Sequence, residues 1–243
     1  MDKKPLIVVF VLFALMFGAC GFNVNIGVDQ GSGNIITESR TVANFDHLSL
    51  SGIGDVTLVQ GEEESLKIEA EDNIIPNIKT EVRDGTLYIT YERKSLLPTK
   101  PIKFYLNMIK IHGLETLGVS SLRSDKITTD QLNVIISGTG SINILKLTAD
   151  KVSTNISGAG NFEAEGQVTD QRIILSGAGN YTGEDLQSKT AEVTITGLGQ
   201  VSIWATDTLN VIISGTGGVE YFGEPKVTKS ISGIGNLTHQ GNK

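Results

Sequence analysis

The sequence has a single cysteine, Cys20, so the domain that follows it has no internal disulfide and must be stabilised by packing. Tryptophan also occurs only once, at Trp204, and aromatic residues make up 6% of the chain. Twenty basic residues against 27 acidic ones give a net charge of −7. Because nucleic-acid phosphates require a basic surface, this charge balance excludes a nucleic-acid partner.

Signs of catalysis or metal binding are also missing from the sequence. The three histidines, His47, His112 and His239, lie far apart and form no ligand pattern. No catalytic motif stands out. We therefore expect no cofactor, no metal and no catalytic residue.

An apolar run of twelve residues, Leu6 to Phe17, follows Lys3 and Lys4. It is too short for a membrane-spanning helix, which needs about 20 residues, and residues 1–19 are typical of a signal peptide. The stretch from Phe17 to Gly21 resembles the bacterial lipobox, although Phe17 stands where that pattern prefers Leu. The resemblance implies that Cys20 carries a lipid anchor, and Gly21 after it favours the outer membrane. Residues 20–39 are predicted to be a flexible tether.

A repeated Ser/Thr-Gly-x-Gly pattern occurs seven times in the chain. From Gly138 onward its first glycines recur at intervals of 20, 19, 20, 18 and 18 residues, a period that indicates a solenoid. Aliphatic residues alternate on both sides of each pattern, as in Leu132, Val134 and Ile136, which indicates strands with one buried face. The sequence therefore predicts an all-β fold, a parallel β-helix with 18 to 20 residues in each coil.

The glycines are expected at the corners of the coils, where positive φ or close backbone approach excludes a side chain. A phosphate-binding loop is the rival interpretation, but it needs a third glycine and a following helix, and here a strand follows each time. The predicted corner glycines are Gly52, Gly54, Gly138, Gly140, Gly158, Gly160, Gly177, Gly179, Gly197, Gly199, Gly215, Gly217, Gly233 and Gly235.

Residues 40–240 are predicted to form one β-helix domain, with regular repeats over 118–240. Residues 40–117 are less regular, with a charged interruption from Tyr91 to Lys100. We expect wider coils there, which also cap the open edge of the sheet.

The ordered series of corners, the lipobox-like start, the segment Asp84-Gly85-Thr86-Leu87 and the late segment Tyr221 to Pro225 together resemble the bacterial head GIN domain family of auto-transporter adhesins. The resemblance covers about residues 40–238. It implies a right-handed, single-stranded β-helix similar in shape to pectin-lyase folds. It carries no established ligand or catalytic residue over to this chain.

Four aspartates are candidates for a cation site or a carbohydrate-cleaving acid pair. Asp130, Asp150 and Asp207 stand eight residues before a corner glycine and Asp170 stands seven before, with Lys189 at the equivalent place between the last two. Coils in register would stack these carboxylates in one column. The alternative, which we favour, is that each aspartate begins a strand and accepts hydrogen bonds from nearby backbone amides.

Two outward positions are candidates for recognition. Trp204 is expected to point outward and either stack on a sugar or lie under a loop. A polar column three residues after the corner glycine runs through Asp55, Ser141, Asn161, Asn180, Gln200, Gly218 and Asn236, and such columns can hydrogen-bond between coils without a ligand.

These observations favour a lipid-anchored binding or adhesion module of the cell envelope, without catalytic activity, that contacts a glycan or a protein. An envelope enzyme acting on polysaccharide and a structural or regulatory envelope protein remain the alternatives, since fold alone does not decide function. Self-association into a homo-oligomer is left open.

Overall fold

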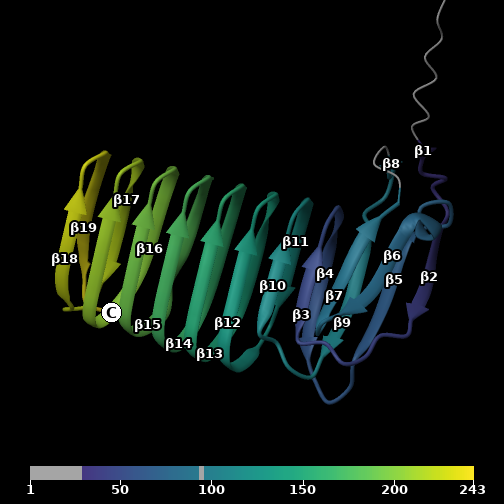
Figure 1. Cartoon of the computed structure of the whole chain (residues 1–243), viewed down its shortest axis with the longest axis horizontal. Helices are drawn as coiled ribbons and strands as arrows, with labels where there is room; N and C mark the ends of the chain where they lie inside the picture. The colour runs from purple at the N-terminus through teal and green to yellow at the C-terminus, as the bar shows by residue number, and fades with distance from the viewer. Residues whose placement is uncertain (1–28, 93–95) are drawn as a thin grey trace, which may run out of the picture.

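The computed structural model describes residues 29–92 and 96–243, so Cys20 and the expected signal peptide lie outside the described residues. The described part is built almost entirely of strands, with one 3-10 turn at Ile75–Asn77. Its coils stack along one long axis, from β2 at one end to β18 and β19 at the other (Figure 1). None of the described residues forms a helix long and apolar enough to cross a bilayer.

The regular coils begin at residue 127, and each coil runs from one Gly-x-Gly corner to the next. Their strands are β12 (Ile127–Ile136), β13 (Thr139–Ile156), β14 (Ala159–Leu175), β15 (Ala178–Ile195), β16 (Leu198–Ile213), β17 (Thr216–Phe222), β18 (Lys226–Ile231) and β19 (Ile234–Gly241). Neighbouring coils pair in parallel and in register at the corners, as in Thr139 with Ala159 and Ile156 with Leu175. The prediction of a parallel β-solenoid is confirmed.

Two sheets form the long walls of the solenoid. The post-corner sheet contains the strand segments that follow each corner, and the pre-corner sheet contains those that precede it. A shorter side segment joins the two within each coil. In β13 the register shifts between Ile144 and Leu147, where the chain leaves the post-corner sheet. Every second side chain in the walls points into one continuous core, which explains the period-two pattern of the sequence.

The first coils do not follow one another in chain order. Their strands are β3 (His47–Leu50), β4 (Ile53–Gln60), β5 (Ser65–Glu71), β6 (Ile78–Arg83), β7 (Thr86–Tyr91), β8 (Leu96–Leu97), β9 (Lys103–Met108), β10 (Gly113–Thr116) and β11 (Val119–Ser124). The layer of β7 and β9 pairs in parallel with β3 and β4, which in turn pair in parallel with β10 and β11. The chain thus makes one wide coil in which Asp55 and Ser121 are neighbours although they lie 66 residues apart. This wide coil lies in the N-terminal third, where the repeat in the sequence is less regular.

Antiparallel strands close this end of the solenoid. The post-corner sheet continues from β9 through β5 to β2 (Ile35–Arg40), and the pre-corner sheet continues from β7 to β6. The core side chains Ile74, Ile75 and Ile78 are buried between the two sheets. The predicted cap is therefore a set of antiparallel strands added to a parallel stack.

The prediction of a flexible tether over residues 20–39 is wrong from residue 29 onward. β1 (Asp29–Gln30) pairs with β8, and β2 pairs along its whole length with β5. A stretch rich in Gly, Asn and Ser is typical of a linker. In the structure, polar side chains of this stretch hydrogen-bond to the cap, as the Ser32 hydroxyl does to Asp72.

Stacking, more than positive φ, explains the corner glycines. Only Gly52, Gly54 and Gly199 of the predicted set have φ between +20° and +160°. A Cβ placed on Gly158, however, would overlap the carbonyl oxygen of Gly138 one coil earlier. The same clash with the preceding glycine oxygen arises at Gly138, Gly177, Gly197, Gly215 and Gly233.

Hydrogen bonds hold these corners together. The carbonyl of Ile136 accepts both the Ser157 and the Gly158 amides, at 2.9 and 3.1 Å, and Gly138 accepts the Ala159 amide at 3.0 Å. The Ser157 hydroxyl, next to the corner glycine, also donates to the hydroxyl of Ser137 one coil earlier, at 3.2 Å.

We predict that Gly158→Val lowers the free energy of unfolding by about 2 to 3 kcal/mol, because the added side chain must push two coils apart. Ala159→Val is the matched control, since residue 159 is the next in the chain but exposed, and its substitution is expected to change stability little. Chemical denaturation measures both. Equal stability of Gly158→Val and the wild type would show that the stacked corner tolerates a side chain.

Candidate functional site

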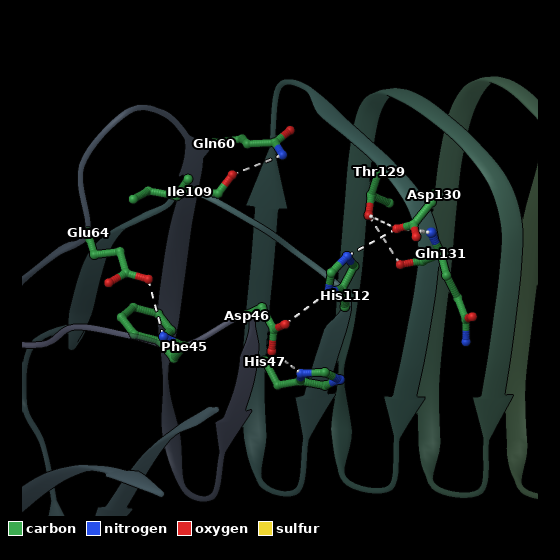
Figure 2. A network of polar contacts seen from close by, with 10 residues as sticks. All are labelled: Phe45, Asp46, His47, Gln60, Glu64, Ile109, His112, Thr129, Asp130 and Gln131. Carbon is green, nitrogen blue, oxygen red and sulfur yellow. Dashed lines mark hydrogen bonds and ion pairs between the residues drawn. The ribbon is translucent and has the colours of Figure 1, made fainter. Parts of the chain in front are cut away.

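Two histidines and two aspartates meet at the junction between the wide coil and the regular coils (Figure 2). The two carboxylate oxygens of Asp46 contact one histidine each, Nδ1 of His47 at 2.6 Å and Nδ1 of His112 at 2.9 Å. The other ring nitrogen of His112, Nε2, lies 3.1 Å from Asp130. We call these four residues the junction network.

Consecutive layers bring the junction network together. Asp46 and His47 lie at the start of β3, His112 directly precedes β10, and Asp130 lies in β12 where the side segment meets the pre-corner sheet. Backbone hydrogen bonds connect the same three layers. The His112 amide donates to the Asp46 carbonyl at 2.8 Å, and the Asn133 amide donates to the His112 carbonyl at 2.8 Å.

The charge of Asp46 is favoured by its partners. Partial burial disfavours its carboxylate, but the hydrogen bonds from His112 and His47 outweigh that effect and hold the pKa of Asp46 below its ordinary value of 3.8. His112 lies between two carboxylates, and both contacts are hydrogen bonds only when each ring nitrogen carries a proton. The pKa of Asp130 is also lowered, first by the backbone amide of Gln131.

This arrangement is suited to joining coils. Both oxygens of Asp46 and both nitrogens of His112 are engaged within the junction network, so their hydrogen-bonding capacity is directed at each other. A cavity of about 310 Å³ lies beside it, lined by Phe45, Asp46, Glu64 and Lys110 among others. Glu64 accepts the amides of Asn44, at 2.6 Å, and Phe45, at 3.2 Å, which fixes the loop that leads into β3.

The junction network was not predicted, because its histidines and aspartates lie far apart along the chain. A usable signal was present. Asp46 stands six residues before Gly52, and His112 stands six residues before Gly118, so both occupy the same place in the repeat. Stacked coils bring such positions side by side, and the structure pairs the adjacent residues His47 and Gly113.

The predicted column of four aspartates is wrong at Asp170. Asp130 and Asp150 occupy equivalent bends, between the paired residues 129 and 131 of one coil and 149 and 151 of the next. Asp170 instead pairs with Lys151 in the coil before and with Thr190 in the coil after, so it lies one residue outside the column. The bend of that coil is at Thr169, eight residues before Gly177, so the spacing of seven places Asp170 one residue past the bend.

The remaining members of that column are mixed in charge. The position after Asp150 is taken by Thr169, and Asp207 lies in the bend beside Lys189. Asp130 accepts the Gln131 amide at 2.9 Å, which is the local role that we favoured for these residues. Within residues 29–92 and 96–243, no group of three or more His, Cys, Asp or Glu side chains is arranged to hold a metal ion.

The polar column of the post-corner sheet is continuous across the coils. Its ladder runs through Asp55, Ser121, Ser141, Asn161, Asn180, Gln200, Gly218 and Asn236. The Asn180 side chain donates to the Asn161 side chain at 3.0 Å, and the backbone amide of Gln200 donates to the Asn180 side chain at 3.2 Å. The expected hydrogen bonding between coils is thus confirmed. Trp204 lies between the buried residues Ile203 and Ala205 and is half-buried on the outer surface, as its position in the alternation predicted.

The family described as "Putative auto-transporter adhesin, head GIN domain" matches residues 44–225. The chain belongs to this family. The resemblance drawn from the corner glycines is therefore confirmed. No curated protein sequence matches this head GIN domain.

Solved structures share the fold of this head GIN domain over most of its length. A crystal structure described as a putative adhesin from Bacteroides fragilis is 26% identical, with a TM-score of 0.84 over 86% of this chain and 99% of that one. A protein described as a putative lipid binding protein from Parabacteroides distasonis is also 26% identical, with a TM-score of 0.67 over 86% and 98%. A putative adhesin from Parabacteroides merdae, 20% identical with a TM-score of 0.64, covers 86% and 98% and shows the fold alone.

We predict that Asp46→Asn lowers the stability of this head GIN domain at pH 7 by about 1 kcal/mol, because charged hydrogen bonds to two histidines are lost. The folded-state pKa of Asp46 lies below 3.8, so its contribution is complete above that pH and is lost as the pH falls through the folded pKa. The difference between variant and wild type should therefore shrink in acid.

Thermal unfolding between pH 7 and pH 2 measures this difference. Asp150→Asn is the matched control, because Asp150 occupies the same bend as Asp130 one coil further and lies outside the junction network. A stability difference for Asp46→Asn that stays constant down to pH 2 would contradict the prediction.

Proposed function

We propose that this protein is a lipid-anchored adhesion module of the bacterial cell envelope, without catalytic activity, which binds a glycan or a protein through the wall of its solenoid. Membership of the head GIN domain family supports an adhesion-type role. The proposal adds the anchor, the wall that recognises the ligand and the chemistry of the ligand.

The observation that carries the proposal is the polar column of the post-corner sheet. It presents amide and hydroxyl groups in line along the stack, at the coil repeat of about 4.8 Å. Its neighbouring outward column is polar too, and Asn143 donates to Glu163 at 2.7 Å across the coils. Asn161 and Asn180 are exposed, so their remaining donors and acceptors face solvent.

A flat wall of this kind suits an extended ligand. A glycan chain carries hydroxyl groups that donate and accept at successive sugar units, and a rigid row of amides can bind several of them together. Because the amides are held by the ladder and by bonds to each other, little side-chain entropy is lost on binding. A protein ligand with an exposed polar strand would meet the same donors and acceptors.

The anchor in this proposal is Cys20. It follows a short apolar run and a small-residue cleavage site, and it is the only cysteine of the sequence. A lipid with several acyl chains holds a protein on a membrane without a spanning helix, because each buried methylene contributes about 0.8 kcal/mol. Gly21 directs the lipoprotein to the outer membrane in this proposal.

We predict that Cys20→Ser abolishes incorporation of a palmitate probe in cells and releases the protein from the membrane fraction. The Thr41→Ser variant, which makes a similarly small change away from the lipobox-like segment, should keep both. Fractionation followed by detection of the probe measures the two properties. Membrane retention and labelling of Cys20→Ser would rule out this anchor.

We predict that the double variant Asn161→Ala, Asn180→Ala binds its best ligand on a printed glycan array about tenfold more weakly, a loss of about 1.4 kcal/mol. The matched control is Asn133→Ala, Asn210→Ala, which removes the same groups from outward positions of the pre-corner sheet. Binding that both double variants lose equally, or that neither loses, would contradict recognition by the post-corner wall. Circular dichroism confirms that both variants are folded.

A further inference from the structure

Exposed apolar side chains gather at the N-terminal end of the corner edge. Ile53, Leu117 and Val119 lie in the first two corners that the chain forms, and Leu97 lies in β8, with exposed fractions of 43, 44, 59 and 59%. We call these four residues the corner patch. The residues that directly follow the first glycine of each corner form a row along the stack, which we call the corner ladder. After Ile53 and Val119, its exposed positions hold Thr139, Ala159, Ala178 and Thr216, with single large apolar residues at Leu198 and Ile234.

A cavity opens within the corner patch. The sequence between β7 and β9 contains no Gly-x-Gly pattern, and a space of about 310 Å³ borders Tyr91, Leu96, Pro98 and Ile102 in this layer. Apolar parts of Ile53, Tyr91, Leu96, Pro98 and Leu117 line it. The Tyr91 hydroxyl donates to the carbonyl of Ile53, so its proton is already engaged within the protein. The cavity therefore favours an apolar chain over a polar ligand.

The N-terminal segment leaves the domain at the corner patch. β1 pairs with β8, and the Gly31 amide donates to the carbonyl of Leu97 at 2.9 Å. Glu71 ties the two sides of this exit together, because its carboxylate accepts the Gly33 amide at 2.7 Å and the Thr99 amide at 2.9 Å. These bonds also lower the pKa of Glu71, the Thr99 side chain contributing most, which keeps it charged. The exit point is thus fixed in place.

We propose that the corner patch rests on the bilayer to which Cys20 anchors the protein, with lipid acyl chains as the occupant of the patch and its cavity. This inference relies on the lipid anchor of the proposed function. Only residues 21–28 separate Cys20 from β1, and even fully extended they span less than about 30 Å.

This short connection decides which occupant the corner patch meets. The anchor holds the patch within reach of the membrane surface at all times, so contact with lipid is effectively intramolecular, whereas a second copy must arrive by diffusion. Each apolar side chain that enters the interface adds to the hydrophobic stabilisation of the bound orientation.

Docking through the corner patch orients the solenoid. The patch belongs to the first coils, and seven coil steps of about 4.8 Å separate Ile53 from Ile234 along the corner ladder. The last corner therefore lies about 34 Å from Ile53, and the post-corner wall is held in a fixed direction relative to the membrane.

The test uses the full chain, produced in a bacterium that lipidates it and reconstituted in vesicles of phosphatidylethanolamine and phosphatidylglycerol. Cys20 is blocked by its lipid, so Val119→Cys or Leu97→Cys provides a single free thiol for an environment-sensitive fluorophore. Leu198→Cys is the matched control, because Leu198 occupies the same place in the repeat as Val119 and is 57% exposed against 59%. Phospholipids with brominated acyl chains serve as quenchers.

We expect the labels at Val119 and Leu97 to be quenched several-fold more strongly than the label at Leu198. Equal quenching at the three positions, in protein that floats with the vesicles, overturns docking by the patch while the anchor stands. Protection of the Val119 label from iodide in water without quenching by the lipids, increasing with protein concentration, assigns the patch to a second copy and also overturns the proposal. Protein that does not float with the vesicles overturns the anchor, and the docking with it.

Discussion

Close contact between the backbones of successive coils is the constraint on which the rest of this structure depends. At each corner from Gly138 onward one carbonyl accepts two amides of the next coil, and the corner glycine lies directly over the glycine of the coil before. This spacing keeps the two walls in register over many coils, so the core side chains of every layer meet the same neighbours. The polar column and the junction network exist because equivalent positions are held one coil apart.

The regular coils were predictable from the sequence because each of their features is local. Leu132, Val134 and Ile136 alternate with polar residues, the corner glycine follows at a fixed distance, and the next coil repeats the pattern. Outward positions such as Asn161 and Trp204 follow from the same alternation. The aspartate column failed for a local reason as well: Asp170 stands seven residues before its corner glycine, which places it beside Lys151 and one residue past the bend. Counting residues back from a corner glycine gives the register of the pre-corner sheet only, because the coils differ in length at the side segment.

The N-terminal third was not predictable in the same way, because its neighbours are set by chain order in space. No local pattern shows that β9 lies between β4 and β5, or that β7 packs on the outer side of β3. The exit segment was missed for a related reason, since Gly31 and Gly33 read as linker residues until Glu71 and Thr99 are placed beside them. The junction network needed only the comparison of Asp46 and His112 at the same distance before a corner glycine.

The last coil is paired on one side only, β18 with β16 and β19 with β17, and most of its side chains are exposed. The hydrogen bonds between parallel coils run along the long axis of the solenoid, which is also the direction in which a load would pass from a ligand on the wall to an anchored N-terminus. Such a load is shared by all the bonds of one coil interface at the same time. Under the proposed function, mechanical resistance is set by the coil interfaces that lie between the ligand and the anchor, and the outermost coil, which supports no neighbour, can detach without disrupting the coils beneath it.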